Sequence, residues 1–155
     1  MKLDALDIKI LDIIKRDAEC QTAQIAEAVG LSTSPCWRRI QRLKEAGVIG
    51  RRVALVDPRK VNLGVTVFVS VRAMEHTEAW FNRFCATVQA IPEVMDLYRM
   101  SGEVDYMLRV VVPDIAAYDA VYKRLIAGIP LQGVTSSFAM EHVKQGTALP
   151  LSYAA

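Results

Sequence analysis

The residues best suited to chemistry in this sequence form a concentration of arginine between residues 32 and 52. Six side chains there are basic and only Glu45 is acidic, whereas the whole 155-residue chain carries a net charge of +2. The basic residues are Arg38, Arg39, Arg42, Lys44, Arg51 and Arg52. Guanidinium groups neutralise phosphates and can donate hydrogen bonds to guanine in the major groove. The segment therefore predicts binding to double-stranded DNA.

Two short helical patterns meet at Gly30 and supply the element that would position these arginines. Glycine allows a sharp turn between packed helices. Ser32 or Ser34 can cap the second helix, and Pro35 fits its first turn, where a missing N–H costs nothing. The apolar residues of the two patterns are Ile25, Ala26, Val29, Ile40 and Leu43. This arrangement is typical of a helix-turn-helix, whose second helix enters the major groove.

An ordinary solvated amphipathic helix is the alternative interpretation, because arginine-rich surface helices are common. The turn, the caps and the position near the N-terminus favour DNA binding. The residues that we assign to DNA contact are Ser32, Ser34, Pro35, Arg38, Arg39, Arg42, Arg51 and Arg52.

The flanking segments complete a small DNA-binding domain over residues 1–50. Asp4 and Asp7 favour the start of a third helix, which continues to about Asp17 and packs on the other two. Gly47 ends the arginine helix. Residues 51–61 are expected to form a wing or a connecting strand, with Arg51 and Arg52 directed at the DNA backbone.

A second domain is predicted over residues 62–155, where the sequence becomes rich in β-type alternation. Strands are expected at 65–71, 93–100, 104–112 and 133–143, and helices at 79–90 and from Pro113 to about Ala127. The order β-α-β-β-α-β is that of a ferredoxin-like sandwich, with two helices on one face of an antiparallel sheet. The fold class is therefore α+β: a winged helix-turn-helix followed by a ferredoxin-like domain.

The sheet face without helices is expected to be rich in valine and to need a partner. The simplest arrangement packs the sheets of two chains together, which gives a homodimer and pairs two DNA-reading helices for a roughly palindromic site.

Several classes of site and of location are disfavoured by composition. No apolar run approaches the roughly 20 residues of a membrane span, and no signal-peptide core is present, so we expect a cytoplasmic protein without membrane partners. Cys20, Cys36 and Cys85 lack the spacing of a disulfide framework or a zinc site. We expect reduced thiols, no metal and no cofactor. Cys36 is either a small packing residue, which we favour, or a redox sensor at a helix N-terminus.

Taken together, these residues resemble the leucine-responsive/asparagine-operon regulator (Lrp/AsnC) family over nearly the whole chain. The shared motifs are LDxxDxxIL at 3–11, VGLSxSPCxxRIxRL at 29–43, Gly47-Val48-Ile49, SGEVDY at 101–106, Val112-Pro113-Asp114 with Tyr118, and EHVKQ at 141–145. The resemblance implies a transcription factor whose C-terminal domain forms dimers and higher assemblies, up to octamers, and binds a small effector, usually an amino acid.

Two departures from the family pattern are visible. Glu19-Cys20-Gln21 replaces the usual Arg-x-Ser before the second helix, which passes the capping role to Thr22. Gly50-Arg51 replaces the usual glycine-aromatic pair after the wing, which favours phosphate contacts there.

The resemblance also implies an effector site at the turn Gly102-x-x-Asp105, near an interface between dimers. The implied effector contacts are Met100, Ser101, Gly102, Asp105, Thr135, Ser136 and Ser137. Glycine lets a ligand approach backbone amides, a carboxylate receives an ammonium group, and hydroxyls serve a carboxylate. The alternative interpretation is a tight β-turn without a ligand.

Two other functions compete with an effector-responsive regulator. One is an enzyme similar to the haem-pathway decarboxylases, but only His76 and His142 are available, and nothing in the sequence pairs either with a carboxylate or a nucleophile. This reading also leaves the arginine segment without a purpose, so we expect no catalytic residues. The other is an architectural DNA-binding protein that responds to no effector.

Overall fold

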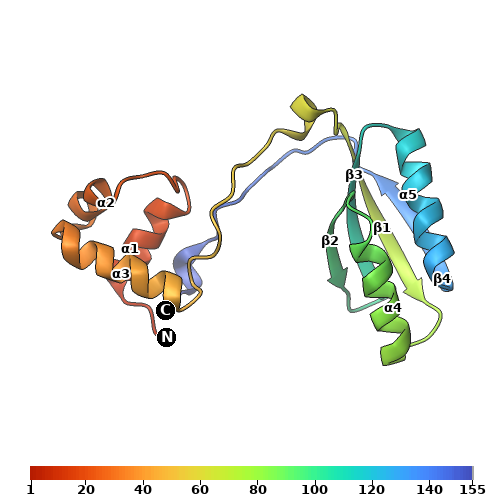
Figure 1. Cartoon of the computed structure of the whole chain (residues 1–155), viewed down its shortest axis with the longest axis horizontal. Helices are drawn as coiled ribbons and strands as arrows, with labels where there is room; N and C mark the ends of the chain where they lie inside the picture. Colours follow the sequence, from red (N-terminus) through yellow and green to blue (C-terminus); the bar gives the residue numbers. More distant parts are fainter. Residues whose placement is uncertain (155) are drawn as a thin grey trace. The chain divides into compact units, whose positions relative to one another are not determined.

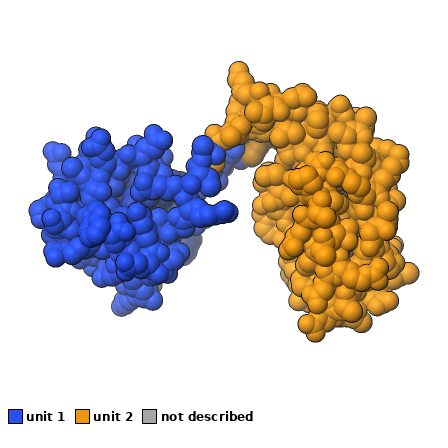
Figure 2. All heavy atoms as spheres, viewed as in Figure 1, with its two compact units in different colours: residues 1–54, 143–155 blue, residues 55–142 orange. Residues whose placement is uncertain are grey.

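The computed structural model describes residues 1–154, which form two compact units (Figures 1 and 2). The helical unit contains residues 1–54 and the segment from Val143 onward, and the sheet unit contains residues 55–142. The sequence assigned the whole of 62–155 to one domain, but the segment from Val143 packs with the helical unit. Its Leu151 lies against that unit's core, and the Leu149 carbonyl accepts a 3.0 Å hydrogen bond from Lys15 Nζ.

Three helices form the body of the helical unit: α1 (Ala5–Ile14), α2 (Thr22–Val29) and α3 (Thr33–Glu45). Each contributes one apolar stripe to a single core, as the spacing of their apolar residues predicted. The buried core residues are Ile10, Leu11, Ile14, Ile25, Ala26, Val29, Cys36, Ile40 and Leu43. Cys36 is fully buried, and burial raises the pKa of its thiol, so it serves as a packing residue.

The turn between α2 and α3 is built as the sequence indicated. Gly30 adopts a left-handed conformation with φ of 73°, which glycine reaches without the clash of a Cβ. Ser32 is the N-cap residue of α3 and Pro35 lies in the first turn, but the Ser32 side chain accepts no hydrogen bond from the helix N-terminus, unlike the predicted cap. The cap of α2 is Gln21, whose N–H donates to Gln24 Oε1 at 3.0 Å; Thr22 is the first helical residue and not the cap.

The wing strand expected within residues 51–61 does not form. Residues 51–57 have no regular secondary structure, and a short 3₁₀ helix, η1 (Pro58–Val61), follows them. A strand requires a neighbour for its backbone hydrogen bonds, and no strand of the described chain pairs with this segment. Its apolar side chains Val53, Leu55 and Val56 are consequently exposed.

The sheet unit has the predicted β-α-β-β-α-β order. Its elements are β1 (Val65–Ala73), α4 (Glu78–Gln89), β2 (Val94–Arg99), β3 (Tyr106–Val112), α5 (Ile115–Gly128) and β4 (Leu131–Phe138). The four strands are antiparallel in the order β2-β3-β1-β4, as in a ferredoxin-like sandwich. Both helices pack on the same face of the sheet (Figure 1).

The last strand is shorter than predicted. β4 ends at Phe138 instead of Val143, because its partner β1 begins at Val65. Phe138 pairs with Val67, and the Ala139 N–H donates to the Thr66 carbonyl at 2.9 Å, which uses the last residues that β1 offers.

The valines of β1 lie on the helix-covered face, which corrects the expectation of a valine-rich open face. Val67, Val69 and Val71 are buried against residues of the two helices. The intervening residues Phe68 and Ser70 lie on the open face, which is mixed in character. Its neighbouring residues on β2 and β3 include Tyr98, Met107 and Arg109, the last paired with Asp96.

None of the described helices is long and apolar enough to cross a membrane.

Candidate nucleic-acid interface and ligand site

The exposed side of α3 includes Ser34, Trp37 and Arg38, which together are called the exposed face of this helix. The buried residues Cys36, Ile40 and Leu43 mark the core side of this helix, and the 3.6-residue period places Ser34 and Arg38 opposite them. Trp37 has an exposed fraction of 52%, which is high for so large an apolar side chain. This face combines a cation, a hydroxyl and an aromatic ring.

A hollow of about 370 Å³ lies where the beginnings of α2 and α3 meet. It is lined by Thr22, Thr33, Ser34, Trp37 and Arg38. Hydroxyl and guanidinium groups are donors suited to phosphate oxygens and base edges, and the indole adds apolar contact. Thr22, Thr33 and Trp37 were not predicted to lie at this site. The signal for Trp37 was available, because it sits between a core cysteine and Arg38 at a position where the apolar stripe does not require a large side chain.

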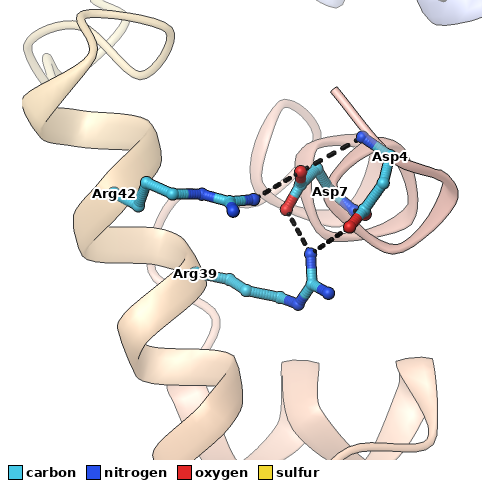
Figure 3. Close-up of polar contacts among 4 residues, drawn as sticks. All are labelled: Asp4, Asp7, Arg39 and Arg42. Atoms are coloured by element: carbon cyan, nitrogen blue, oxygen red, sulfur yellow. Dashed lines mark hydrogen bonds and ion pairs between the residues drawn. The ribbon is translucent and has the colours of Figure 1, made fainter. Parts of the chain in front are cut away.

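The other two arginines of α3 are held by acidic residues at the start of α1 (Figure 3). Arg39 donates through Nη1 to Asp4 Oδ2 at 2.6 Å and to Asp7 Oδ1 at 2.8 Å. Arg42 donates through Nη2 to Asp7 Oδ2 at 2.6 Å. The same aspartates cap α1, since the Asp7 N–H donates to Asp4 Oδ1 at 2.8 Å and the Asp4 N–H donates to Asp7 Oδ2 at 3.2 Å.

These contacts give the three arginines different electrostatic surroundings. The hydrogen bonds that Arg39 donates to the Asp4 and Asp7 carboxylates raise the pKa of Arg39. The hydrogen bonds that Asp4 accepts from the Asp7 N–H and from Arg39 lower the pKa of Asp4. The side chain of Arg39 is 25% exposed and that of Arg42 is 51% exposed. Arg38, Arg51 and Arg52 are all exposed. Arg39 is therefore the least accessible of the arginines predicted to contact DNA.

The turn between β2 and β3 has the hairpin character that its glycine suggested. The Met100 N–H donates to the Asp105 carbonyl at 2.8 Å, and Gly102 has φ of 124°, a conformation that side chains disfavour. Ser101 completes the exposed bend. Asp105 Oδ2 accepts a 2.8 Å hydrogen bond from the Ala73 N–H, and the Glu103 carbonyl accepts one from Arg72 Nε at 3.0 Å.

One contact of this turn was not foreseen. His76 Nε2 lies 3.9 Å from Asp105 Oδ1, a proximity that the spacing of these residues in the sequence does not indicate. The two residues are 29 positions apart, and the loop after β1 brings them together. The sequence carries no local pattern that marks this contact.

The hydroxyl residues of β4 do not gather around the turn within a single chain. Alternation along β4 separates Ser136 from Thr135 and Ser137, and the Ser136 hydroxyl is hydrogen-bonded to that of Tyr118 below the sheet. β1 lies between β4 and β3, which puts β4 about 10 Å away from β3 at two strand spacings. The turn and the β4 hydroxyls are thus separate groups in one chain. No cluster of three or more potential metal ligands occurs among residues 1–154.

Comparison with known proteins agrees with both units. Residues 3–49 match the family model of a winged helix-turn-helix DNA-binding domain, and residues 66–149 match that of the Lrp/AsnC ligand binding domain. The chain belongs to the Lrp/AsnC family of transcriptional regulators. Its two units are accordingly a DNA-binding domain and a ligand-binding domain, and it is a DNA-binding transcriptional regulator.

Individual members of the family are similar along almost the entire chain. The DNA-binding transcriptional activator DecR of Escherichia coli is 45% identical, over 96% of this chain and 99% of DecR. The crystal structure of an AsnC family transcriptional regulator from Agrobacterium tumefaciens is 60% identical, with a TM-score of 0.93 over 97% of this chain and 99% of that one. A transcriptional regulator from Neisseria meningitidis, solved in complex with L-methionine, is 34% identical, with a TM-score of 0.93 over 99% of this chain and 100% of its own.

Proposed function

We propose that the exposed face of α3 reads DNA and that the predicted residues around it hold the duplex. The observation that carries this proposal is the exposed group of Ser34, Trp37 and Arg38 beside the hollow at the start of α3. Arg38 and Trp37 contact base edges, while Ser32, Ser34 and Pro35 approach the backbone at the start of the helix. Arg51 and Arg52 reach flanking phosphates from the linker. Arg42 contacts the DNA from the edge of the exposed face of α3.

We propose further that the effector is an amino acid bound at the turn between β2 and β3. The regulator from Neisseria meningitidis, of nearly the same fold, was solved with L-methionine. Asp105 has one carboxylate oxygen engaged by the Ala73 N–H. The other oxygen lies 3.9 Å from His76 Nε2, beyond hydrogen-bond distance, and can receive an ammonium group. Because Thr135 and Ser137 lie away from this turn in one chain, a site that includes them draws on a second copy. Ser136 faces the helices, where its hydroxyl is bonded to that of Tyr118, and does not share that site.

The assembly that follows is a homodimer that associates into a larger oligomer, up to an octamer. The dimer forms through the open sheet face, where Phe68 is 41% exposed and Met107 lies opposite Ser70. An effector that binds one assembly better than another shifts the equilibrium between them, and with it the spacing of the α3 helices that DNA meets. The protein acts in the cytoplasm, where its DNA lies, and catalyses no reaction.

The experiment that tests this function combines ligand and DNA binding. A thermal-shift screen against the twenty amino acids identifies ligands, because a ligand that binds the native state raises its melting temperature. Each ligand found is then added to a titration of the protein against a 40-base-pair duplex, which is selected from a random pool by the wild-type protein. We expect at least one amino acid to shift both measurements. DNA binding with a flat screen would instead indicate the architectural alternative.

A further inference from the structure

We propose that Asp7 is a positioning residue for DNA recognition: it orients the guanidinium of Arg42 at the edge of the exposed face of α3. Arg39 fixes the carboxylate from the other side. This inference rests on the proposed contribution of Arg42 to DNA binding. It assigns a role in DNA reading to a residue of α1, the helix that lies outside the helix-turn-helix itself.

The first observation is the burial of the Asp7 side chain, which has an exposed fraction of 0%. A buried carboxylate is very unfavourable unless both oxygens are paired. Here Oδ1 accepts from Arg39, and Oδ2 accepts from Arg42 and from the Asp4 N–H. Together, these three partners hold the carboxylate in a single orientation.

The second observation is that the contacts exceed what capping requires. A capping box at the start of α1 needs only the reciprocal bonds between Asp4 and Asp7. The carboxylate of Asp7 additionally receives two side chains from α3, which come from positions three residues apart on the same side of that helix. Figure 3 shows the two guanidinium groups converging on Asp7.

The third observation is that the two arginines are not equivalent. Arg39 is shielded and bound to two carboxylates, so it is a clamp within the domain. Arg42 contacts Asp7 through Nη2 and remains 51% exposed, which leaves the outer part of its guanidinium accessible. Arginine loses much rotamer freedom when it binds, and an arginine that is already oriented loses less. By orienting the guanidinium, Asp7 therefore favours directional hydrogen bonds from Arg42 to a base edge over non-directional electrostatic contact with phosphate.

A double-mutant cycle with Asp7→Asn and Arg42→Gln tests this inference in the full-length protein. The readout is the specificity ratio, which is the affinity for the selected 40-base-pair duplex divided by that for mixed-sequence DNA of the same length. We expect Asp7→Asn to lower this ratio about tenfold in the wild-type background, which is the sequence discrimination typical of one arginine–base contact. In the Arg42→Gln background, Asp7→Asn should lower the ratio less than twofold. Circular dichroism at the assay temperature establishes that each variant is folded.

Asp12→Asn is the matched control, because it removes one acidic charge from an exposed position of the same helix. It should leave the specificity ratio unchanged. An equal loss for Asp7→Asn in both backgrounds would show a purely structural role, and an unchanged ratio in a folded Asp7→Asn variant would overturn the inference directly. Arg38→Gln separates this result from the proposed function: if it also leaves DNA binding intact, the α3 face itself is wrongly assigned.

A measurement on the wild-type protein covers the case in which Asp7→Asn does not fold. In ¹⁵N NMR spectra at low temperature, we expect resolved guanidinium signals for Arg39 and Arg42, because each is held by a carboxylate, and averaged signals for exposed Arg38. Loss of individual signals in Arg39→Gln and Arg42→Gln assigns them. An Arg42 signal as averaged as that of Arg38 would exclude positioning by Asp7.

Discussion

Three arginines within five residues of α3 have three different surroundings. Arg38 is exposed, Arg39 is clamped by two aspartates, and Arg42 is tethered by one of them but open on its other side. A count of positive charge in the sequence treats them as equal. The structure distinguishes an exposed arginine, an arginine bound to two carboxylates, and an arginine that is bound to one carboxylate and half exposed.

The free arginine gives the simplest prediction at the residue scale. Arg38→Gln should weaken DNA binding and reduce the slope of log K against log salt concentration by about 0.9, because the positive charge that Arg38 places among the phosphates flanking its base contact is lost. Titrations at several salt concentrations measure this slope. Arg83→Gln removes the same charge from an exposed position of α4 in the sheet unit and serves as the control. An identical slope for the two variants would contradict the assignment of Arg38.

The effector site also rests on one residue, Asp105. Asp105→Asn keeps an oxygen that can accept from the Ala73 N–H but removes the charge that would bind an ammonium group. We expect the amino-acid thermal shift to disappear, while affinity for the selected duplex changes less than twofold. Glu103→Gln, an exposed acid in the same turn, is the control and should keep the shift. A full shift in Asp105→Asn would place the ligand elsewhere.

At the scale of elements, the two helices of the sheet unit approach closely at one glycine. A Cβ built on Gly128 of α5 would lie 2.4 Å from Thr87 Cγ2, 2.8 Å from its Oγ1 and 3.2 Å from its Cβ. Rotation of the threonine cannot clear all three atoms, so the helices themselves must separate. This position in α5 is therefore restricted to glycine by packing.

Gly128→Ala should accordingly destabilise the protein by about 1–2 kcal/mol, since overpacking outweighs the gain in helix propensity. Denaturant unfolding measures the free energy. The double variant Thr87→Ala with Gly128→Ala removes the two nearest of these atoms, Cγ2 and Oγ1, and should recover most of the loss. Failure of the second substitution to recover stability would mean that the strain arises elsewhere.

Most elements could be predicted from sequence because their signals are local. Apolar periodicity and caps gave α1 to α3, and strand alternation gave the β-α-β-β-α-β order. The errors concern features set by distant partners. Residues 51–57 have a strand-like pattern but no neighbouring strand, β4 stops where β1 ends, and the valines of β1 face the helices. The contact between His76 and Asp105 and the clamp on Arg39 also depend on long-range packing that no spacing reveals.

At the scale of the whole molecule, the open sheet face is the surface proposed for dimerisation. Phe68→Glu places a charge in the centre of this face, opposite Arg109 on β3 and Ser137 on β4, and burial of that charge between two sheets would be unfavourable. We expect sedimentation velocity to show loss of the dimer at micromolar concentration. Ile115→Glu changes an exposed apolar residue of α5 on the helix side and should leave the assembly intact. Dissociation in both variants would point to a different interface.

The segment from Val143 gives a second prediction at this scale. Leu151→Ala removes a side chain that packs on the core of the helical unit and should destabilise that unit by about 1 kcal/mol, less than a fully buried leucine. Amide hydrogen exchange should rise in α1 to α3 and not in the sheet unit. Leu149→Ala is the control, because this leucine is exposed and only its backbone carbonyl contacts Lys15. Unchanged exchange in Leu151→Ala would show that the segment is not part of the helical unit.

The same segment determines when the DNA-binding unit is completed during synthesis. Residues 55–142 leave the ribosome before residues 143–154, so α1 to α3 acquire their last packing element only after the whole ligand-binding sheet has been made. A nascent chain or a prematurely terminated one therefore carries three helices that lack Leu151. The order of translation thus delays a fully stabilised DNA reader until the domain that would regulate it is present.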